Sequence, residues 1–222
     1  MGVREQLLEQ GYFQTPPMLP PDLVARVRDD VARDNQRAFL EDAMWDLFDL
    51  LVPVAREALA HDVCITPAFW AWNVGPGGFG WGPHRDSPET ARDPEGGLAI
   101  ITVWVPLTDA TTRNGCVHCV PAYWDIGYQS VHANSIVLHQ QCVRALPAAA
   151  GSVLGWSHSL LHWGGACAPD APPRMATSLE LVRSDLASTV PRAYPAGWRP
   201  EVAERQAMIE AMRVRYAHML AD

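Results

Sequence analysis

The segment Leu98-Ala-Ile-Ile-Thr-Val-Trp-Val-Pro-Leu107 is apolar along almost its whole length, and the turn signal Asn114-Gly115 follows it. Short apolar segments that end at Gly, Pro or Asn-Gly are typical of β-strands. Comparable segments recur between about residues 64 and 183, namely 68–74, 116–120, 135–138, 152–156 and 177–182. Many strands with few helices between them predict a mainly β core, either an antiparallel barrel or a jelly roll (double-stranded β-helix).

Helical spacing of apolar residues marks the two ends of the chain. Asp22 is the expected N-cap of a first stripe, which consists of Leu23, Val24, Val27 and Val31. A second stripe runs from Met44 to Val52 and on toward Leu59, and we expect Pro53 to kink or split this helix. A last stripe consists of Ile209, Met212, Tyr216 and Leu220. Helices at about residues 1–60 and 200–220 are therefore expected to pack on the outside of the sheet.

Length and composition indicate one globular domain, residues 1–222, with 48% hydrophobic and 19% charged residues. The net charge is -8 without a basic cluster, which argues against nucleic acid or an anionic membrane as a partner. No apolar segment approaches the roughly 20 residues of a membrane span. The N-terminus lacks the apolar core of a signal peptide. We expect a cytoplasmic protein, monomeric or homodimeric, that acts on a small molecule.

The counts of basic residues and of cysteines limit the kinds of site that the chain can form. All 17 basic residues are arginine, which excludes a Schiff-base lysine, a P-loop lysine and a kinase-type lysine. Together with many Ala and Pro residues, this bias suggests a GC-rich bacterial genome. The 5 cysteines are an odd number in a chain that needs no disulfides, so reduced and mostly buried thiols are expected.

The segment Trp81-Gly-Pro-His84-Arg-Asp86 carries the candidate metal ligands. Side chains alternate along a strand, so His84 and Asp86 would point to the same side. One imidazole, one carboxylate and a second histidine from elsewhere form the facial triad of non-haem Fe(II) oxygenases. Alone, a His-x-Asp pair is a weak signal, and a partner is needed.

The partner is expected in the segment that begins at Gly151 and ends a strand at His162, with Arg174 opening the next strand. An arginine in the same cavity offers a carboxylate a planar, bidentate grip that lysine cannot match. Iron, one aspartate, a dicarboxylate and one arginine sum to zero charge, which avoids the penalty for an uncompensated buried ion.

On these residues the chain resembles the phytanoyl-CoA dioxygenase family of double-stranded β-helix oxygenases, over most of its length. The resemblance rests on Glu9-Gln-Gly-Tyr-Phe, Leu19-Pro-Pro-Asp-Leu-Val, the strand Ile101-Thr-Val-Trp-Val-Pro-Leu-Thr-Asp109 with Asn114-Gly-Cys116, and the spacing of His162 and Arg174. It implies that His84, Asp86 and His162 bind Fe(II) and are catalytic. It also implies that Arg174 binds 2-oxoglutarate, with Trp104 and Ser178 as further contacts.

The implied reaction uses dioxygen and 2-oxoglutarate to hydroxylate an amino acid, an acyl group or a natural-product intermediate, with release of succinate and CO2. Desaturation or cyclisation would begin from the same hydrogen abstraction. The chain departs from the family pattern in two places. Pro121-Ala-Tyr-Trp replaces the usual Pro-Gly-Ser-His, and Gly164 stands where some relatives have a serine that holds 2-oxoglutarate.

Other interpretations are weaker. Gly75-Pro-Gly-Gly-Phe-Gly80 matches a dinucleotide fingerprint, but the Trp-Gly-Pro that follows cannot readily start the required helix. Cys116-Val-His-Cys119 is half a zinc site without a second half, and His158 is expected to be a core or supporting residue. A cupin-like isomerase or hydrolase that uses the same His, Asp and His ligands remains an alternative, as does a binding module that has lost the chemistry.

Overall fold

The structure is a computed structural model that describes residues 1–130 and 136–217. Two antiparallel sheets form its centre. The larger sheet has the order β1-β6-β3-β8-β2-β9, with bounds Tyr12–Gln14, Leu154–Ser157, Ile100–Pro106, Arg174–Arg183, Val63–Val74 and Tyr194–Pro195. The smaller sheet has the order β5-β4-β7, with bounds Arg144–Leu146, Val117–Val120 and Leu161–Gly164.

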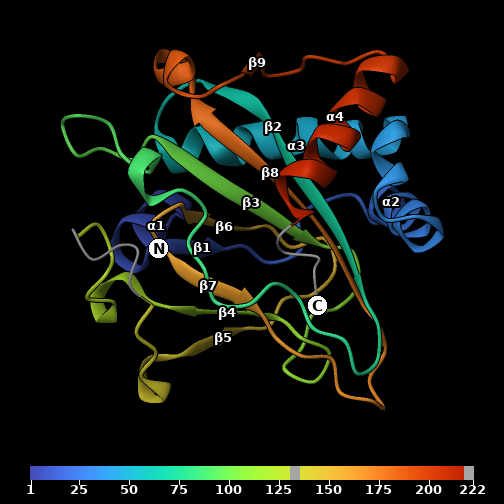
Figure 1. Cartoon of the computed structure of the whole chain (residues 1–222), viewed down its shortest axis with the longest axis horizontal. Helices are drawn as coiled ribbons and strands as arrows, with labels where there is room; N and C mark the ends of the chain where they lie inside the picture. The colour runs from blue at the N-terminus through green and yellow to red at the C-terminus, as the bar shows by residue number, and fades with distance from the viewer. Residues whose placement is uncertain (131–135, 218–222) are drawn as a thin grey trace.

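In the described part of the chain, four α-helices flank the sheets: α1 (Val3–Gln10), α2 (Pro21–Arg33), α3 (Asp42–Leu59) and α4 (Val202–Arg215). Short 3-10 helices cover Arg37–Leu40, Pro88–Thr90, Ala122–Trp124, Gln140–Cys142 and Ser184–Thr189. Figure 1 shows α2, α3 and α4 gathered near β2 and β8, with β4, β5 and β7 on the other side of the molecule. Among the described residues, no helix combines the length and apolar character needed to cross a bilayer.

The mainly β prediction is confirmed, although the sheets within the described residues do not form one closed barrel. Five of the six predicted strand segments coincide with β2, β3, β4, β6 and β8. The segment 135–138 was predicted wrongly, because residues 136–138 form no strand and Ser135 lies outside the described residues. Ile136, Val137 and Leu138 are exposed, so no buried face holds this short apolar segment in a sheet.

The predicted helices are present, but two of their details differ from the prediction. Helix α2 begins at Pro21 after Pro20, so Asp22 lies in the first turn and is not the N-cap. Proline suits the first helical position, where its missing N–H is not needed. Helix α3 continues through Pro53 without splitting. Pro53 is exposed, so water can satisfy the carbonyl that loses its hydrogen bond. Leu220 of the last predicted stripe lies outside the described residues.

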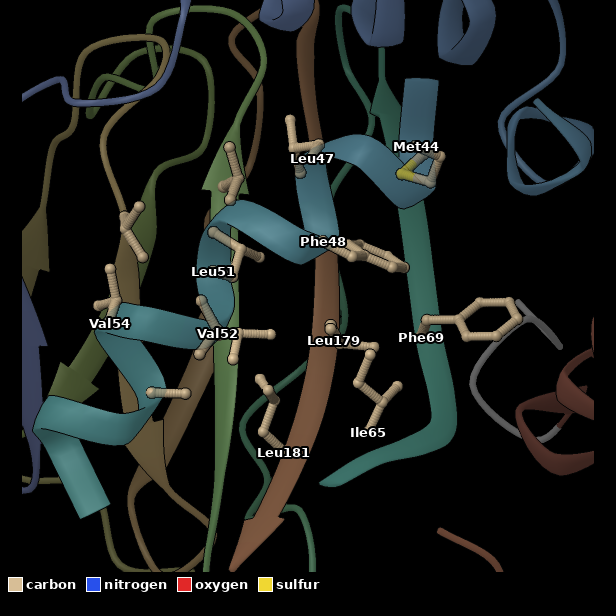
Figure 2. Packing of buried hydrophobic residues seen from close by; sticks show 14 of the residues in the cluster. Met44, Leu47, Phe48, Leu51, Val52, Val54, Ile65, Phe69, Leu179 and Leu181 are labelled. Atoms are coloured by element: carbon tan, nitrogen blue, oxygen red, sulfur yellow. The ribbon is translucent and has the colours of Figure 1, made fainter. Parts of the chain in front are cut away.

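Alternation along the large sheet creates two different faces. On one face, Ile65, Phe69, Leu179 and Leu181 pack against α3, which supplies Leu47, Phe48 and Leu51 (Figure 2). The opposite face carries the other parity of each strand and joins the small sheet in a second cluster that includes Trp104, Trp156, Val117 and Cys119. The cavity described below lies on this second face.

Candidate metal centre

His84 and His162 are brought together by the backbone. They form an isolated antiparallel bridge in which the amide of each residue donates to the carbonyl of the other, both at 3.0 Å. His162 comes from β7, and His84 from the segment after β2. The two rings have centroids 4.4 Å apart. A pairing between segments far apart in sequence therefore places both imidazoles at one point.

Asp86 completes this group. Its Oδ1 lies 3.5 Å from His84 Nε2 and 3.7 Å from His162 Nε2. One ligand atom from each of the three residues lies within 4.8 Å of the others. Two imidazole nitrogens and one carboxylate oxygen at this separation are a donor set suited to a divalent transition metal such as Fe(II).

The other ring nitrogen of each histidine is held by the backbone. His84 Nδ1 lies 2.7 Å from the carbonyl of Gly82, and His162 Nδ1 lies 3.0 Å from the carbonyl of Leu160. A carbonyl can only accept, so each Nδ1 carries the proton and donates it. In the neutral imidazole this leaves the lone pair on Nε2, the nitrogen nearer Asp86, which is the tautomer that a metal ligand needs.

Asp86 is oriented by residues that no sequence motif pointed to. Thr102 Oγ1 donates to Asp86 Oδ2 at 2.6 Å, and Trp156 Nε1 donates to the same oxygen at 3.0 Å. Thr102 and Trp156 are register partners on β3 and β6. With Oδ2 occupied by two donors, Oδ1 is left free to face the histidines. His158 is buried, with its Nε2 3.3 Å from Thr102 Oγ1 and 4.0 Å from Asp86 Oδ2, as expected of a supporting residue.

The pKa shifts of His162 and Asp86 suit metal binding, whereas that of His84 favours its protonated form. Burial lowers the pKa of His162 to about 4, so this imidazole is neutral near pH 7. Burial raises the pKa of Asp86, but the nearby His162, His84 and His158 outweigh it and hold the pKa well below its usual range. For His84, burial is outweighed by the hydrogen bond and the charge of Asp86, which raise its pKa. The carboxylate is thus ionised and ready to bind a cation.

Arg174 lies in the same cavity and has no anionic partner among the described residues. Its side chain is buried, and its Nε and Nη2 have no hydrogen-bond partner. Burial lowers its pKa to about 10, still far above neutral pH. A buried guanidinium without a counter-ion is costly, so the site is built to receive an anion. A dicarboxylate such as 2-oxoglutarate fits this requirement.

Trp104 and Ser178, which the resemblance implies as further contacts of 2-oxoglutarate, lie in the wall of the cavity. They are register partners on β3 and β8, and both line the cavity with Arg174. The Arg174 guanidinium carbon lies 5.8 Å from the centre of the Trp104 ring. No hydrogen bond joins Ser178 to Arg174 in the described structure, so proximity alone places Ser178 here.

The glycine-rich segment before His84 is not a dinucleotide site. Residues 75–83 contain no helix, which the fingerprint would require. Gly80 and Gly164 instead lie against each other beside Arg174. A Cβ on Gly164 would lie 2.9 Å from the Cα of Gly80 and 3.2 Å from Arg174 Nη2. This close approach explains why a serine could not stand at position 164 without a shift.

Several other expectations are resolved by the structure. Cys116, His118 and Cys119 do not form a metal-binding group within the described residues, and His118 stacks on Trp163. Arg85, Arg113 and Arg183 each have an aspartate partner: Arg85 pairs with Asp125, Arg113 with Asp170, and Arg183 with Asp93 and Asp185. Besides Trp104, five further tryptophans line the cavity, namely Trp70, Trp72, Trp81, Trp156 and Trp163.

One protein-family model matches the sequence of the chain, and solved structures match its fold. The phytanoyl-CoA dioxygenase (PhyH) family model matches residues 50–176, more than half of the 222 residues. No curated protein matches the chain in sequence.

Solved structures match over most of their length. The non-heme alpha ketoglutarate dependent epimerase SnoN from nogalamycin biosynthesis has a TM-score of 0.65 and 17% identity over 82% of each chain. The carbocyclase SnoK from the same biosynthesis has a TM-score of 0.65 and 16% identity, over 90% of this chain and 93% of SnoK. HygX from Streptomyces hygroscopicus, solved with nickel and 2-oxoglutarate, has a TM-score of 0.62 and 14% identity, over 82% of this chain and 87% of HygX. At these identities the likeness shows a common fold.

Proposed function

Because the chain belongs to the phytanoyl-CoA dioxygenase family, we propose that it is an oxygenase dependent on Fe(II) and 2-oxoglutarate. In this proposal His84, Asp86 and His162 bind the metal, and Arg174 binds the distal carboxylate of 2-oxoglutarate. Trp104 and Ser178 flank the co-substrate. The whole chain acts as one domain, and its two sheets correspond to a double-stranded β-helix core.

The observation that carries the proposal is the unpartnered Arg174 beside the three metal-binding candidates. A metal site alone fits many enzymes, but hydrolases and isomerases with this ligand set need no buried guanidinium. A carboxylate bound there would restore the hydrogen bonds that Nε and Nη2 lack. It would also balance the buried positive charge. The cupin-like alternative leaves Arg174 without a role, so it is the weaker candidate.

When bound together, Fe(II), 2-oxoglutarate and dioxygen supply an oxidant that removes a hydrogen atom from a substrate carbon, with CO2 and succinate as by-products. The side chains of the protein orient the metal ligands and exclude water from the site. Thr102 and Trp156 keep Asp86 Oδ1 directed at the metal position. The tryptophans around the cavity exclude water and provide an apolar wall for the substrate.

We propose hydroxylation of a small molecule as the outcome, with an amino acid, an acyl group or a natural-product intermediate as the substrate. The activities for which SnoN and SnoK are named, epimerase and carbocyclase, belong to those proteins. For this chain, they support a reaction that starts by hydrogen abstraction, because hydroxylation, epimerisation and ring closure can all start that way.

Succinate release tests the proposal. Purified protein incubated with 2-oxoglutarate and dioxygen should form succinate only when Fe(II) is present. The rate should fall to background in His162→Ala and should be unaffected in His118→Ala, which changes a histidine outside the metal group. Iron-independent succinate formation, or full activity in His162→Ala, would exclude the proposed function.

A further inference from the structure

Glu180 is a buried carboxylate in the cavity that the proposed reaction leaves unused. It lies on the same face of β8 as Arg174 and Ser178, and it is the register partner of Thr102. Its exposed fraction is 9%. An acidic side chain is seldom buried to this extent unless it is paired or functional. It therefore requires an explanation beyond packing.

The partners of Glu180 within the described residues do not satisfy it. Thr66 Oγ1 donates to Oε2 at 3.3 Å, which is a long hydrogen bond. Oε1 has only Arg215 Nη2 at 3.7 Å, beyond hydrogen-bonding distance. Burial raises the pKa of Glu180, and the positive charges nearby only partly oppose this rise. The carboxylate thus has room and need for a closer cation.

Three aromatic rings that contact one another line the same cavity as this carboxylate. The ring centroids are 5.6 Å apart for Trp70 and Trp81, 5.3 Å for Trp70 and Tyr216, and 4.8 Å for Trp81 and Tyr216. Each ring and Glu180 line the cavity that also holds the metal group. Aromatic faces next to a carboxylate attract a cation through both the ring quadrupole and the negative charge.

Arg215 indicates that a cation is accepted at this place. It lies at the end of α4, and its side chain is 45% exposed. Its guanidinium carbon is 5.4 Å from the centre of the Tyr216 ring, while its Nη2 approaches Glu180. A half-exposed arginine near the cavity mouth can withdraw into water at little cost. The ammonium group of a ligand could therefore take the place of this guanidinium beside Glu180.

We propose that Glu180, with Trp70, Trp81 and Tyr216, forms a subsite for a protonated amine of the substrate. This subsite rests on the proposed function, because it defines the substrates of that function as small molecules that carry an amine. Bound there, the ammonium donates to Glu180 Oε1 and lies against the aromatic faces. The carbon to be oxidised is then held toward His84 and Asp86, which share the cavity with Glu180.

The test uses metal-free protein, so its result does not depend on 2-oxoglutarate chemistry. Butylammonium is titrated into wild type and Glu180→Gln and followed by tryptophan fluorescence and calorimetry. Butanol is the neutral probe of the same shape. Wild type should bind butylammonium more tightly than butanol, and Glu180→Gln should weaken only butylammonium, by about tenfold or more, since a charge-assisted hydrogen bond is lost.

Two control variants sharpen the result. Glu210→Gln removes the same charge from an exposed position on α4 and should bind both probes as wild type does. Arg215→Met removes the guanidinium that competes for Glu180, so this variant should bind butylammonium more tightly than wild type does. Equal binding of the two probes by wild type, or an unchanged affinity in Glu180→Gln with an unchanged melting temperature, would overturn the subsite. Succinate formation from 2-oxoglutarate is measured separately and decides the proposed function alone.

Discussion

His84 and His162 exchange two backbone hydrogen bonds of 3.0 Å, so the two backbone segments that carry the imidazoles are held side by side. The bridge uses main-chain atoms and would persist when either side chain is removed. The side chains and the fold are therefore separable in experiment, which allows the metal site to be tested without unfolding the protein.

Replacing either histidine should remove the metal and leave the fold. His84→Ala or His162→Ala leaves two of the three ligands, and the loss of one ligand from a three-residue site reduces Fe(II) affinity sharply. Metal content after dialysis, together with circular dichroism, measures both properties. A variant with native spectra that still retains one iron per chain would show that the ligand is wrongly assigned.

The carboxylate support can be tested independently of the ligands. Thr102→Val removes one donor to Asp86 Oδ2 and should weaken metal binding by about 10- to 100-fold, as is typical for partners of metal ligands. Thr102→Ser keeps the hydroxyl and should restore most of the affinity. Competition with a metal chelator gives the affinities. If the valine and serine variants bind metal equally well, the hydroxyl does not orient Asp86.

Arg174→Lys should raise the KM for 2-oxoglutarate by at least about tenfold, because a point charge replaces the bidentate fork. The kcat should change less, because the lost interaction is mostly uniform binding. Arg113→Lys is the matched control, since Arg113 lies in an exposed ion pair with Asp170. A KM that is the same in Arg174→Lys and wild type would mean that another residue binds the co-substrate.

Gly164→Ala should change the proposed 2-oxoglutarate pocket through steric contact with Arg174. The added Cβ would lie 2.9 Å from Gly80 and 3.2 Å from Arg174 Nη2, so the guanidinium must shift. We expect a severalfold rise in the KM for 2-oxoglutarate together with some loss of thermal stability, since overpacking costs typically about 1–3 kcal/mol. Gly75→Ala, where the added atom meets nothing within 4 Å, should match wild type in both measurements. An unaffected KM in Gly164→Ala would argue against a tightly built pocket.

The sequence predicts the strand-rich core well because its apolar segments are long and bounded by turn residues. It also selects His84, Asp86, His162 and Arg174, because their spacing resembles that of one family, and the structure brings all four to one cavity. The roles assigned to them stay predictions until the experiments above are done.

Other residues of the site are not predictable in this way. Thr102 and Trp156 reach Asp86 through the register of β3 and β6, which places these two residues opposite each other. A single sequence shows alternation along a strand, but it does not show which residues of two strands lie opposite each other. The register depends on long-range packing and appears only in the folded structure.

The central claim is that one cavity binds both Fe(II) and 2-oxoglutarate, the first through three side chains and the second through Arg174. Anaerobic calorimetric titration of 2-oxoglutarate into metal-free and Fe(II)-loaded protein tests it most directly. We expect tight binding to the Fe(II) form, much weaker binding to the metal-free form, and the same loss in iron-treated His162→Ala. Binding of equal strength in all three would contradict it.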